Sequence, residues 1–391
     1  MASSGRPLLV EPLHILGGGS IGLFVAASIR SAFPNYPVKV LFRPHHKHRI
    51  QPNNNHVIVS IQQNKRPRMI PVPAQIIVQD SSPNLQQPAH RPIRNLLLTT
   101  KAYQATEAIQ SIMPRLVHRD QLRLIVMSNG ALAIKEELDP IFSLPVLSRE
   151  TTAMTPSTTN ATKSDLPTRN YRQSPQWIMA MTTHGVYQDP PPDQDLYYLH
   201  HVGNGRTLVG GMPENGMTQI WDQSGLNCQS ISPAAMQVVL WQKLAANAVC
   251  NPLTTLWKIP NGQLWDQPSF RSILTQLLQE VSNVSQALEQ PENNRSHHPV
   301  DLQQLTPQAL RAFVEQVIHD NQTNKSSMWY DVEHGRRTEV DYLNGYIVRK
   351  GRELGIDCPA NEELLFQIHS LSDNSIRDKE DRTEREESQK E

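Results

Sequence analysis

A glycine-rich turn, GGGSIG, constrains the fold of this chain more than any other segment. It follows the apolar run LHIL and leads into the helical pattern SIGLFVAASIR, after which YPVKVLF has the composition of a second strand. In the spacing G-x-G-x-x-G, the first two glycines permit a tight turn and close backbone approach, and the third lets helix and strand pack. The helix N-terminus is then free to hold a pyrophosphate. Alone the motif is a weak signal, but in this context it predicts dinucleotide contacts at Gly17, Gly19, Ser20, Ile21 and Gly22.

The end of the second predicted strand indicates which dinucleotide binds. An NAD site usually places Asp or Glu about twenty residues after the glycines, where it can bond the ribose hydroxyls. Here the segment reads VLFRPHHKHR, and Arg43 at the strand end suits a 2′-phosphate. The nearby His45, His46 and His48 could be taken for metal ligands, but adjacent histidines in a basic loop are more often solvated surface. The sequence therefore predicts NADP(H) and no metal.

Strand and helix patterns alternate through the first half of the chain. The segments IRNLLLTTKAYQATEAIQSI and QLRLIVMSNGALAIKEEL each change from an apolar, strand-like run to a helical pattern. This alternation favours a parallel sheet with helices on its faces. From about Ser232 onward, the apolar positions recur with a helical period. We therefore expect an α/β N-terminal domain over residues 1–231 and an all-α domain over residues 232–371.

Three polar segments are expected to lie outside these two cores. Residues 66–93 are rich in Pro, Gln and Ser, and residues 150–175 are nearly free of large apolar side chains. Both segments are predicted to be surface insertions. Thirteen of the nineteen residues after Ser372 are charged, so residues 372–391 are predicted to be a disordered tail.

The composition argues against several classes of partner. The 37 Lys and Arg residues balance 37 Asp and Glu residues, so no net charge would attract nucleic acid or an anionic membrane. No apolar run approaches the ~18 residues of a membrane span. The three cysteines lie far apart without metal-ligand spacing, and the first residues are poor material for a targeting signal. We expect a cytoplasmic monomer or homodimer that acts on a small molecule.

A polar stripe interrupts the apolar segment LWQKLAANAVCNPLTTLW. Lys243, Asn247 and Asn251 are spaced four residues apart, which places them on one side of a helix. Buried polar groups cost free energy unless something pairs with them. Either the protein or a ligand must therefore satisfy this stripe, unless Lys243 is a surface lysine whose stem alone is covered.

Further polar candidates follow predicted strands or cluster near the C-terminus. Lys101 and Asn129 each follow an apolar strand, at the edge where open α/β sheets bind ligands. Either residue alone could be a surface lysine or a turn asparagine. The segment NKSSMWYDVEHGRRTEVDYLNG contains Asn324, Ser327 and Glu339. Taken by itself, Glu339 is most simply a solvated carboxylate.

The combination of GGGSIG, TTKAYQA, SNG, KLAANAVCNPLTTLWKIPNG and SSMWYDVEHGRRTEVDYLNG resembles the ketopantoate reductase family. The resemblance covers nearly all of residues 13–371. It implies a Rossmann-type domain joined to a helical domain of the 6-phosphogluconate-dehydrogenase C-terminal type, with the active site between them. It also implies NADPH-dependent reduction of 2-dehydropantoate to (R)-pantoate, on the route to pantothenate and coenzyme A. The polar insertions and the charged tail depart from the family pattern without interrupting a matched motif.

The same resemblance implies roles for individual residues. Lys243 matches the family's catalytic lysine, and Glu339 matches its active-site carboxylate, which either orients that lysine or binds the substrate hydroxyl. The matched substrate-pocket positions are Asn247, Asn251, Asn261, Asn324 and Ser327, and the matched cofactor contacts include Arg43, Lys101 and Asn129. The carboxylate, carbonyl and hydroxyl of the substrate would then satisfy the polar stripe.

Two alternative functions stay open at this point. The chain could be a reductase of another branched 2-keto acid, because the same motifs would serve it. It could also be a non-catalytic NADPH-binding regulatory protein of the same fold. The retention of both Lys243 and Glu339 argues against the second alternative, since a binding protein needs neither an acid nor its carboxylate partner.

Overall fold

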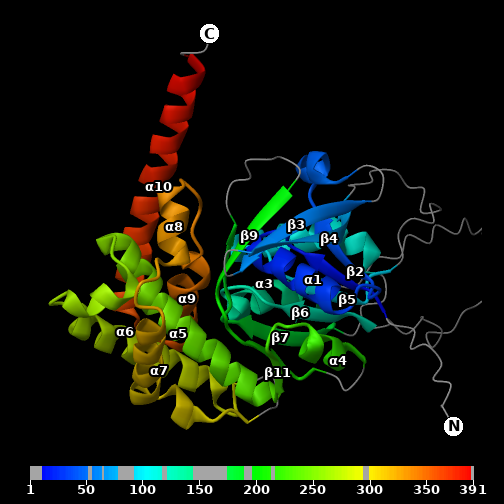
Figure 1. Ribbon diagram of the computed structural model, residues 1–391. Coiled ribbons are helices and arrows are strands. Elements are labelled where there is room, and N and C mark those ends of the chain that lie inside the picture. The colour runs from blue at the N-terminus through cyan, green and yellow to red at the C-terminus, as the bar shows by residue number, and fades with distance from the viewer. Residues whose placement is uncertain are drawn as a thin grey trace, which may run out of the picture.

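The computed structural model describes residues 11–51, 55–63, 66–77, 92–116, 121–143, 174–188, 196–212, 216–293 and 299–388. A sheet with its covering helices forms one half of the molecule, and the helices from α5 to α10 form the other half (Figure 1). This arrangement confirms the predicted fold class, an α/β part followed by an all-α part. The domain bounds given above remain our proposal. No helix in these ranges is long and apolar enough to cross a bilayer.

The sheet has eleven strands within the described residues, in the order β11-β10-β7-β6-β5-β1-β2-β4-β3-β9-β8. The strands are β1 Leu13–Leu16, β2 Val38–Phe42, β3 His56–Gln63, β4 Arg66–Ile76, β5 Asn95–Leu98, β6 Arg123–Val126, β7 Gln176–Thr182, β8 Gly185–Gln188, β9 Leu196–Gly203, β10 Thr207–Gly210 and β11 Cys228–Ile231. Strands β4, β2, β1, β5, β6 and β7 are mutually parallel. Strand β1 pairs with β2 on one side and β5 on the other, so the chain reverses its direction of winding there. Open α/β sheets bind ligands beside the carboxyl ends of such strands.

Two hydrophobic cores cover the two faces of the sheet. The sheet-half helices are α1 Ser20–Ala32, α2 Ala105–Ile112, α3 Ala131–Ser143 and α4 Gly216–Gln223. Helices α1 and α4 bury Leu23, Phe24 and Trp221 against one face. The other core includes Phe142 of α3 and continues into the helical half through Trp241. Because this second core spans both halves, it fixes the helical half against the strand ends.

The helical half begins where a strong helix-start signal stands in the sequence. Its helices are α5 Pro233–Trp257, α6 Phe270–Glu289, α7 Pro307–Asp320, α8 Ser327–Glu333, α9 Asn344–Leu354 and α10 Pro359–Ser388. The Ser232 side chain accepts a hydrogen bond from the backbone N–H of Ala235, and Pro233 occupies the first helical position. Both features favour helix initiation, because they satisfy or remove N–H groups that have no partner within the helix.

The predicted surface insertion at residues 66–93 is wrong for its first part. Residues 66–76 form β4, which lies inside the sheet between β2 and β3. Ile70, Val72 and Ala74 are buried and alternate with more exposed neighbours, as expected of a strand with one covered face. The prolines and polar residues of this segment concealed that alternation. Residues 78–91, and 150–173 of the second predicted insertion, lie outside the described residues.

The prediction of a disordered tail after Ser372 is also wrong for most of its length. Helix α10 continues to Ser388 and extends beyond the other helices (Figure 1). Lys, Arg and Glu are good helix formers. The segment also continues a helix whose first turns are already packed, so its residues become helical without the free-energy cost of nucleating a new helix. The extension also contacts α8: Ser375 Oγ donates to the carbonyl of Val332, and Lys379 Nζ donates to that of His334 at 2.8 Å.

Truncation of the chain after Ser372 is expected to lower the midpoint of thermal unfolding by about 2–4 °C. The truncation removes the bonds to the carbonyls of Val332 in α8 and of His334 directly after it, and each such bond contributes on the order of 1 kcal/mol. A chain that ends after Thr383 keeps both donors and serves as the matched control. Calorimetry of the two truncated proteins makes the comparison, and equal midpoints would show that these bonds add no stability.

Candidate active site

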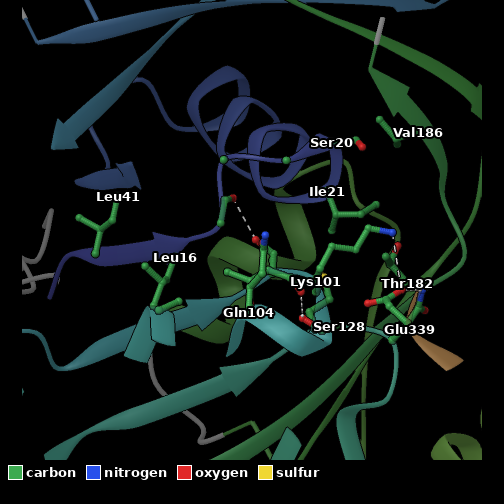
Figure 2. Close-up of a pocket in the computed structure, with 18 of the residues that line it drawn as sticks. Leu16, Ser20, Ile21, Leu41, Lys101, Gln104, Ser128, Thr182, Val186 and Glu339 are labelled. Carbon is green, nitrogen blue, oxygen red and sulfur yellow. Dashed lines mark hydrogen bonds and ion pairs between the residues drawn. The ribbon is translucent and has the colours of Figure 1, made fainter. Parts of the chain in front are cut away.

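A cavity of about 660 Å³ lies at the carboxyl ends of β1 and β5, where the sheet meets the helical half. In Figure 2, Leu16 and Leu41 lie toward one end of the cavity and Thr182 and Glu339 toward the other. The predicted site residues that line it are Gly17, Gly19, Ser20, Ile21, Arg43, Lys101, Asn129, Lys243, Ser327 and Glu339. Residues predicted to bind cofactor and residues predicted to carry chemistry therefore share one cavity.

The glycine turn leaves room beside the N-terminus of α1. A Cβ atom at Gly22 would lie 1.9 Å from the carbonyl oxygen of Gly17, so helix and turn could not pack with any other residue there. Gly17 has φ +130°, a conformation that favours glycine. A Cβ atom at Gly19 would meet no atom within 4 Å, because this residue borders open space. With no acidic residue in the first turn of α1, the space fits a phosphate group.

Arg43 lines the cavity directly after β2. Among the described residues, its guanidinium forms one ion pair, with Glu107 Oε2 at 3.5 Å, and long, exposed pairs of this kind contribute little to stability. Segment η1, Pro44–Arg49, follows and contains the three histidines. His46 lines the cavity rather than standing in solvent, and burial together with neighbouring basic groups lowers its pKa to about 4. No group of three or more metal-ligating side chains occurs among the described residues.

Glu339 belongs to the helical half, but its carboxylate is held by the sheet half. It immediately precedes the short segment η7, Val340–Tyr342, and is 6% exposed. Glu339 Oε1 accepts a hydrogen bond from the backbone N–H of Ala102 at 2.9 Å, and Oε2 accepts one from Asn129 Nδ2 at 3.1 Å. Lys101 Nζ lies 3.7 Å from the same Oε2. The predicted active-site carboxylate and two predicted cofactor contacts, Lys101 and Asn129, thus form one cluster.

A glycine explains how Asn129 reaches the helical half. Gly130 has φ +67°, and a Cβ atom there would lie 2.7 Å from the Cβ of Tyr342. Only a residue without a side chain allows this close approach of the loop after β6 to η7. Glycine is therefore required at position 130 both by the turn after β6 and by the contact of this turn with Tyr342 of the helical half.

Lys101 forms the shortest ion pair made by any cavity-lining residue in the described part of the chain. Its Nζ lies 2.6 Å from Asp331 Oδ2, and Asp331 also pairs with Arg336 at 3.1 Å. Burial opposes the charge of Lys101, but the carboxylates of Glu339 and Asp331 outweigh it and raise the pKa of Lys101. Its ammonium is therefore charged and directed at carboxylates of the helical half.

Lys243 projects from α5 into the same cavity with few partners. Its Nζ donates one long hydrogen bond, 3.4 Å, to the carbonyl oxygen of Thr182 at the end of β7. An ammonium has three donors, so this bond leaves capacity for a ligand. Burial lowers the pKa of Lys243 to about 8, although the negative charge of Glu339 acts in the opposite direction. A lysine with this pKa can hold a proton at neutral pH and release it readily.

The predicted substrate residues divide into two groups. Asn247 lines a small cavity of about 20 Å³, which shares Lys243 and Asn129 with the main cavity, and Ser327 lines the main cavity itself. Asn251 is buried on α5, but neither of these two cavities includes it.

Asn261 and Asn324 also lie outside both cavities. The backbone N–H of Asn261 donates to the carbonyl of Asn324 at 3.1 Å, and side chains of both residues bond Asn321. Asn261 Oδ1 is buried and has no hydrogen-bond partner among the described residues. The pocket assignments of these residues remain predictions.

Sequence reasoning did not single out several polar residues in or beside the cavity, among them Thr182, Thr100 and Asp331. Thr182 and Thr100 line the cavity, and the hydroxyl oxygen of Thr100 is buried without a partner in the described structure, as expected beside a ligand position. Thr182 ends β7 and Thr100 lies two residues after β5, so both stand near the end of an apolar strand, which is the signal that identified Lys101. Asp331 lies inside a segment already singled out, but an aspartate on a helix gives no sign of its burial.

Comparison with known proteins gives consistent results for both halves. The family model "Ketopantoate reductase PanE/ApbA" matches residues 13–214, and "Ketopantoate reductase PanE/ApbA C terminal" matches residues 235–372. The 2-dehydropantoate 2-reductase of Vibrio cholerae is 32% identical over 280 residues, which cover 71% of this chain and 77% of that protein. The enzyme of the same name from Escherichia coli O157:H7 is 30% identical over 70% and 72% of the two chains.

Solved structures share the fold at lower identity. A PanE/ApbA family ketopantoate reductase from Ralstonia eutropha superposes with a TM-score of 0.63 at 19% identity, covering 93% of this chain and 99% of that one. A D-mandelate dehydrogenase, solved with NADH and anilino(oxo)acetate, gives a TM-score of 0.66 at 16% identity with the same coverage.

Proposed function

The chain belongs to the ketopantoate reductase family, and from this premise we propose that it reduces 2-dehydropantoate to (R)-pantoate with NADPH, in the synthesis of pantothenate and coenzyme A. The family consists of oxidoreductases, and a nicotinamide cofactor suits the fold. The observation that carries the proposal is the meeting of Lys243, Glu339 and the glycine turn in one cavity. A binding-only protein would have no use for a buried, weakly bonded lysine beside a carboxylate.

The cofactor would occupy the part of the cavity that the sheet half builds. NADPH supplies the hydride when bound. The open space at Gly19 and the N-terminus of α1 would hold its pyrophosphate, and Arg43 would pair with the 2′-phosphate. No acidic residue follows β2 at the position where NAD sites use one to bond the ribose hydroxyls.

Lys243 would act on the carbonyl oxygen of the substrate. Reduction of a ketone places negative charge on this oxygen, and a nearby ammonium can stabilise that charge and supply the proton. The Lys243 ammonium has donors to spare because only Thr182 bonds it among the described residues. Its lowered pKa, about 8, makes the proton easier to transfer than one on an ordinary lysine.

Glu339 would serve in one of two ways. Its negative charge favours the protonated form of Lys243, which would keep the acid ready for turnover. Alternatively, it could bind the terminal hydroxyl of the substrate. A carboxylate offers about four acceptor positions, and three protein donors approach this one, so capacity for a hydroxyl remains.

A substrate panel tests the proposed function. NADPH oxidation is followed with 2-dehydropantoate, with other branched 2-keto acids, and with an aromatic 2-keto acid, because a structural neighbour is a D-mandelate dehydrogenase. We expect the highest kcat/KM with 2-dehydropantoate. A preference for another keto acid would replace the substrate assignment, and tight NADPH binding without turnover of any keto acid would favour a regulatory protein.

Arg43→Ala is expected to weaken NADPH binding by roughly one to two powers of ten and to leave NADH binding nearly unchanged. A charge-assisted bond to phosphate is worth about 1.5–3 kcal/mol, and only NADPH offers that phosphate. Dissociation constants from fluorescence titration give the comparison. Glu107→Gln removes the ion-pair partner of Arg43 without removing the guanidinium, so it should retain NADPH preference. Equal weakening of both coenzymes by Arg43→Ala would exclude this role.

A further inference from the structure

Asp331 is a buried carboxylate that neither the cofactor nor the substrate site requires. It is 3% exposed, lies on α8, and does not line the main cavity. Its two oxygens pair with two cations, Lys101 at 2.6 Å and Arg336 at 3.1 Å. Its own carbonyl accepts the backbone N–H of Arg336 at 2.9 Å, so the turn after α8 closes around it.

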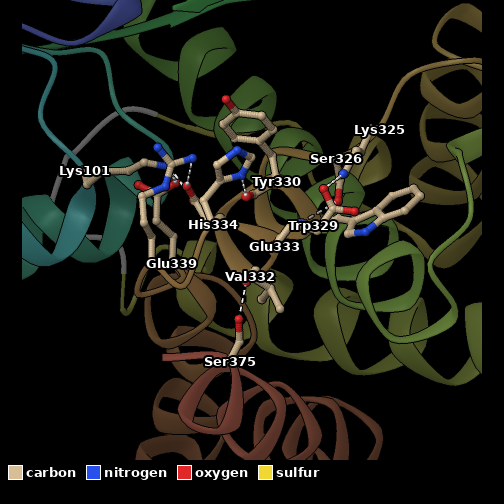
Figure 3. A network of polar contacts seen from close by, with 12 residues as sticks. Lys101, Lys325, Ser326, Trp329, Tyr330, Val332, Glu333, His334, Glu339 and Ser375 are labelled. Atoms are coloured by element: carbon tan, nitrogen blue, oxygen red, sulfur yellow. Dashed lines mark hydrogen bonds and ion pairs between the residues drawn. The ribbon is translucent and has the colours of Figure 1, made fainter. Parts of the chain in front are cut away.

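The short bond to Asp331 determines where the Lys101 ammonium lies. Lys101 extends from the loop after β5 and has two acidic partners in the helical half. The bond to Asp331 is 2.6 Å long, whereas the nearest oxygen of Glu339 is 3.7 Å away. Figure 3 shows Lys101 and Glu339 together, beside the polar contacts that continue along α8 to Ser375. If the Asp331 carboxylate were removed, the Lys101 ammonium would keep one acidic partner among the described residues, Glu339.

The position of Lys101 matters because Glu339 also acts on Lys243. If Lys101 moved from its present 3.7 Å into hydrogen-bond contact with Glu339, it would offset more of the negative charge that favours protonated Lys243. We propose that Asp331 is a positioning residue: its carboxylate holds the Lys101 ammonium 3.7 Å from Glu339, short of direct hydrogen-bond contact, and so leaves more of the charge of Glu339 to act on Lys243. This inference rests on the proposed function of Lys243 as the acid.

The inference predicts a shift in the pH dependence of turnover. Lys243 must be protonated to donate, so the rate is full below its pKa and is lost above it. Asp331→Asn removes one negative charge and allows Lys101 to approach Glu339 more closely than 3.7 Å, and both changes lower the pKa of Lys243. The other charged or titratable side chains around the cluster and in the cavity lining are Tyr103, Arg336, Arg337, His184, His45, His46 and Arg43. All of them are unchanged in this variant.

The experiment compares kcat–pH profiles of the wild type, Asp331→Asn, Asp331→Glu and Arg336→Gln. We expect the alkaline limb of Asp331→Asn to move to lower pH by a few tenths to about one unit, less than the 1–3 units of a charge in direct contact. Asp331→Glu should restore the limb. Arg336→Gln loosens the same turn but keeps the carboxylate on Lys101, so its limb should stay in place or move slightly to higher pH.

A second measurement does not depend on turnover. The rate of Lys243 acetylation by a small anhydride, followed by mass spectrometry across pH, reports the pKa of this lysine directly. The same downward shift in Asp331→Asn would support the inference even if 2-dehydropantoate were not the substrate. An unmoved Lys243 pKa, with kcat reduced equally at every pH, would overturn it and make Asp331 purely structural.

Discussion

Lys243→Ala is expected to lower kcat by at least about 10²-fold while NADPH binding stays close to normal. A positioned general acid alone contributes about 10²-fold to a rate. The variant also loses the charge that stabilises the carbonyl oxygen in the transition state, so the decrease in kcat should be at least this large. Within the described part of the chain the side chain makes one long hydrogen bond, to Thr182, so its removal should not disturb the fold. Steady-state kinetics give kcat, and calorimetry gives the dissociation constant of NADPH.

The wild-type enzyme provides the pH control for this prediction. Because the Lys243 pKa is lowered to about 8, wild-type kcat should be level below this pH and fall as the pH rises through it. The residual rate of Lys243→Ala should lack that limb. A wild-type-like kcat in the folded variant would exclude Lys243 as the acid, and lost NADPH binding would assign it to the cofactor instead.

Glu339→Ala is expected to reduce kcat/KM by roughly 10–100-fold. The change removes the carboxylate that acts on Lys243 and leaves the donors of Ala102 and Asn129 without their partner, and bonds to charged groups are worth about 1.5–3 kcal/mol. Glu136→Gln removes a more exposed ion pair, with Lys350, outside the cavity and should be near wild type. An unaffected kcat/KM in Glu339→Ala would remove Glu339 from the mechanism.

The same variant can distinguish the two tasks proposed for Glu339. A comparison substrate is the keto acid that has the carbon skeleton of 2-dehydropantoate but lacks its terminal hydroxyl. If Glu339 binds the hydroxyl, the variant should lose its activity mainly toward 2-dehydropantoate, with much of the loss in KM. If Glu339 keeps Lys243 protonated, both substrates should lose activity alike, and the alkaline limb should move to lower pH.

Local patterns were enough to predict part of the fold and of the candidate site. The glycine turn was predictable because G-x-G-x-x-G acts within one strand–turn–helix unit, and Gly22 indeed has no space for a side chain. Lys243 and Asn247 are one helical turn apart, so their approach to adjoining cavities followed from spacing alone.

Contacts between distant segments were not predictable in this way. The ion pair of Lys101 and Asp331 joins residues 230 positions apart, and neither residue's neighbours indicate the other. Strand β4 was missed for a different reason. Its prolines indicated a loop, and the alternation of buried and exposed residues becomes evident only when the strand is paired with β2 and β3. The helical tail was missed because its charge was taken as disorder, although α8 supplies carbonyls for it to bond.

The hydrogen bonds of Glu339 restrict how this protein could be rebuilt by exchanging parts with a relative. A chimera that joined this sheet half to another helical half would need more than matching ligand-contacting residues. It would also need the complementary pairs that bridge the junction: Asn129 with Glu339, Lys101 with Asp331, and Gly130 with Tyr342. A bulkier residue at position 130 would hold the two halves apart, and the carboxylate would then lose its donors even though every residue that touches the ligands had been retained.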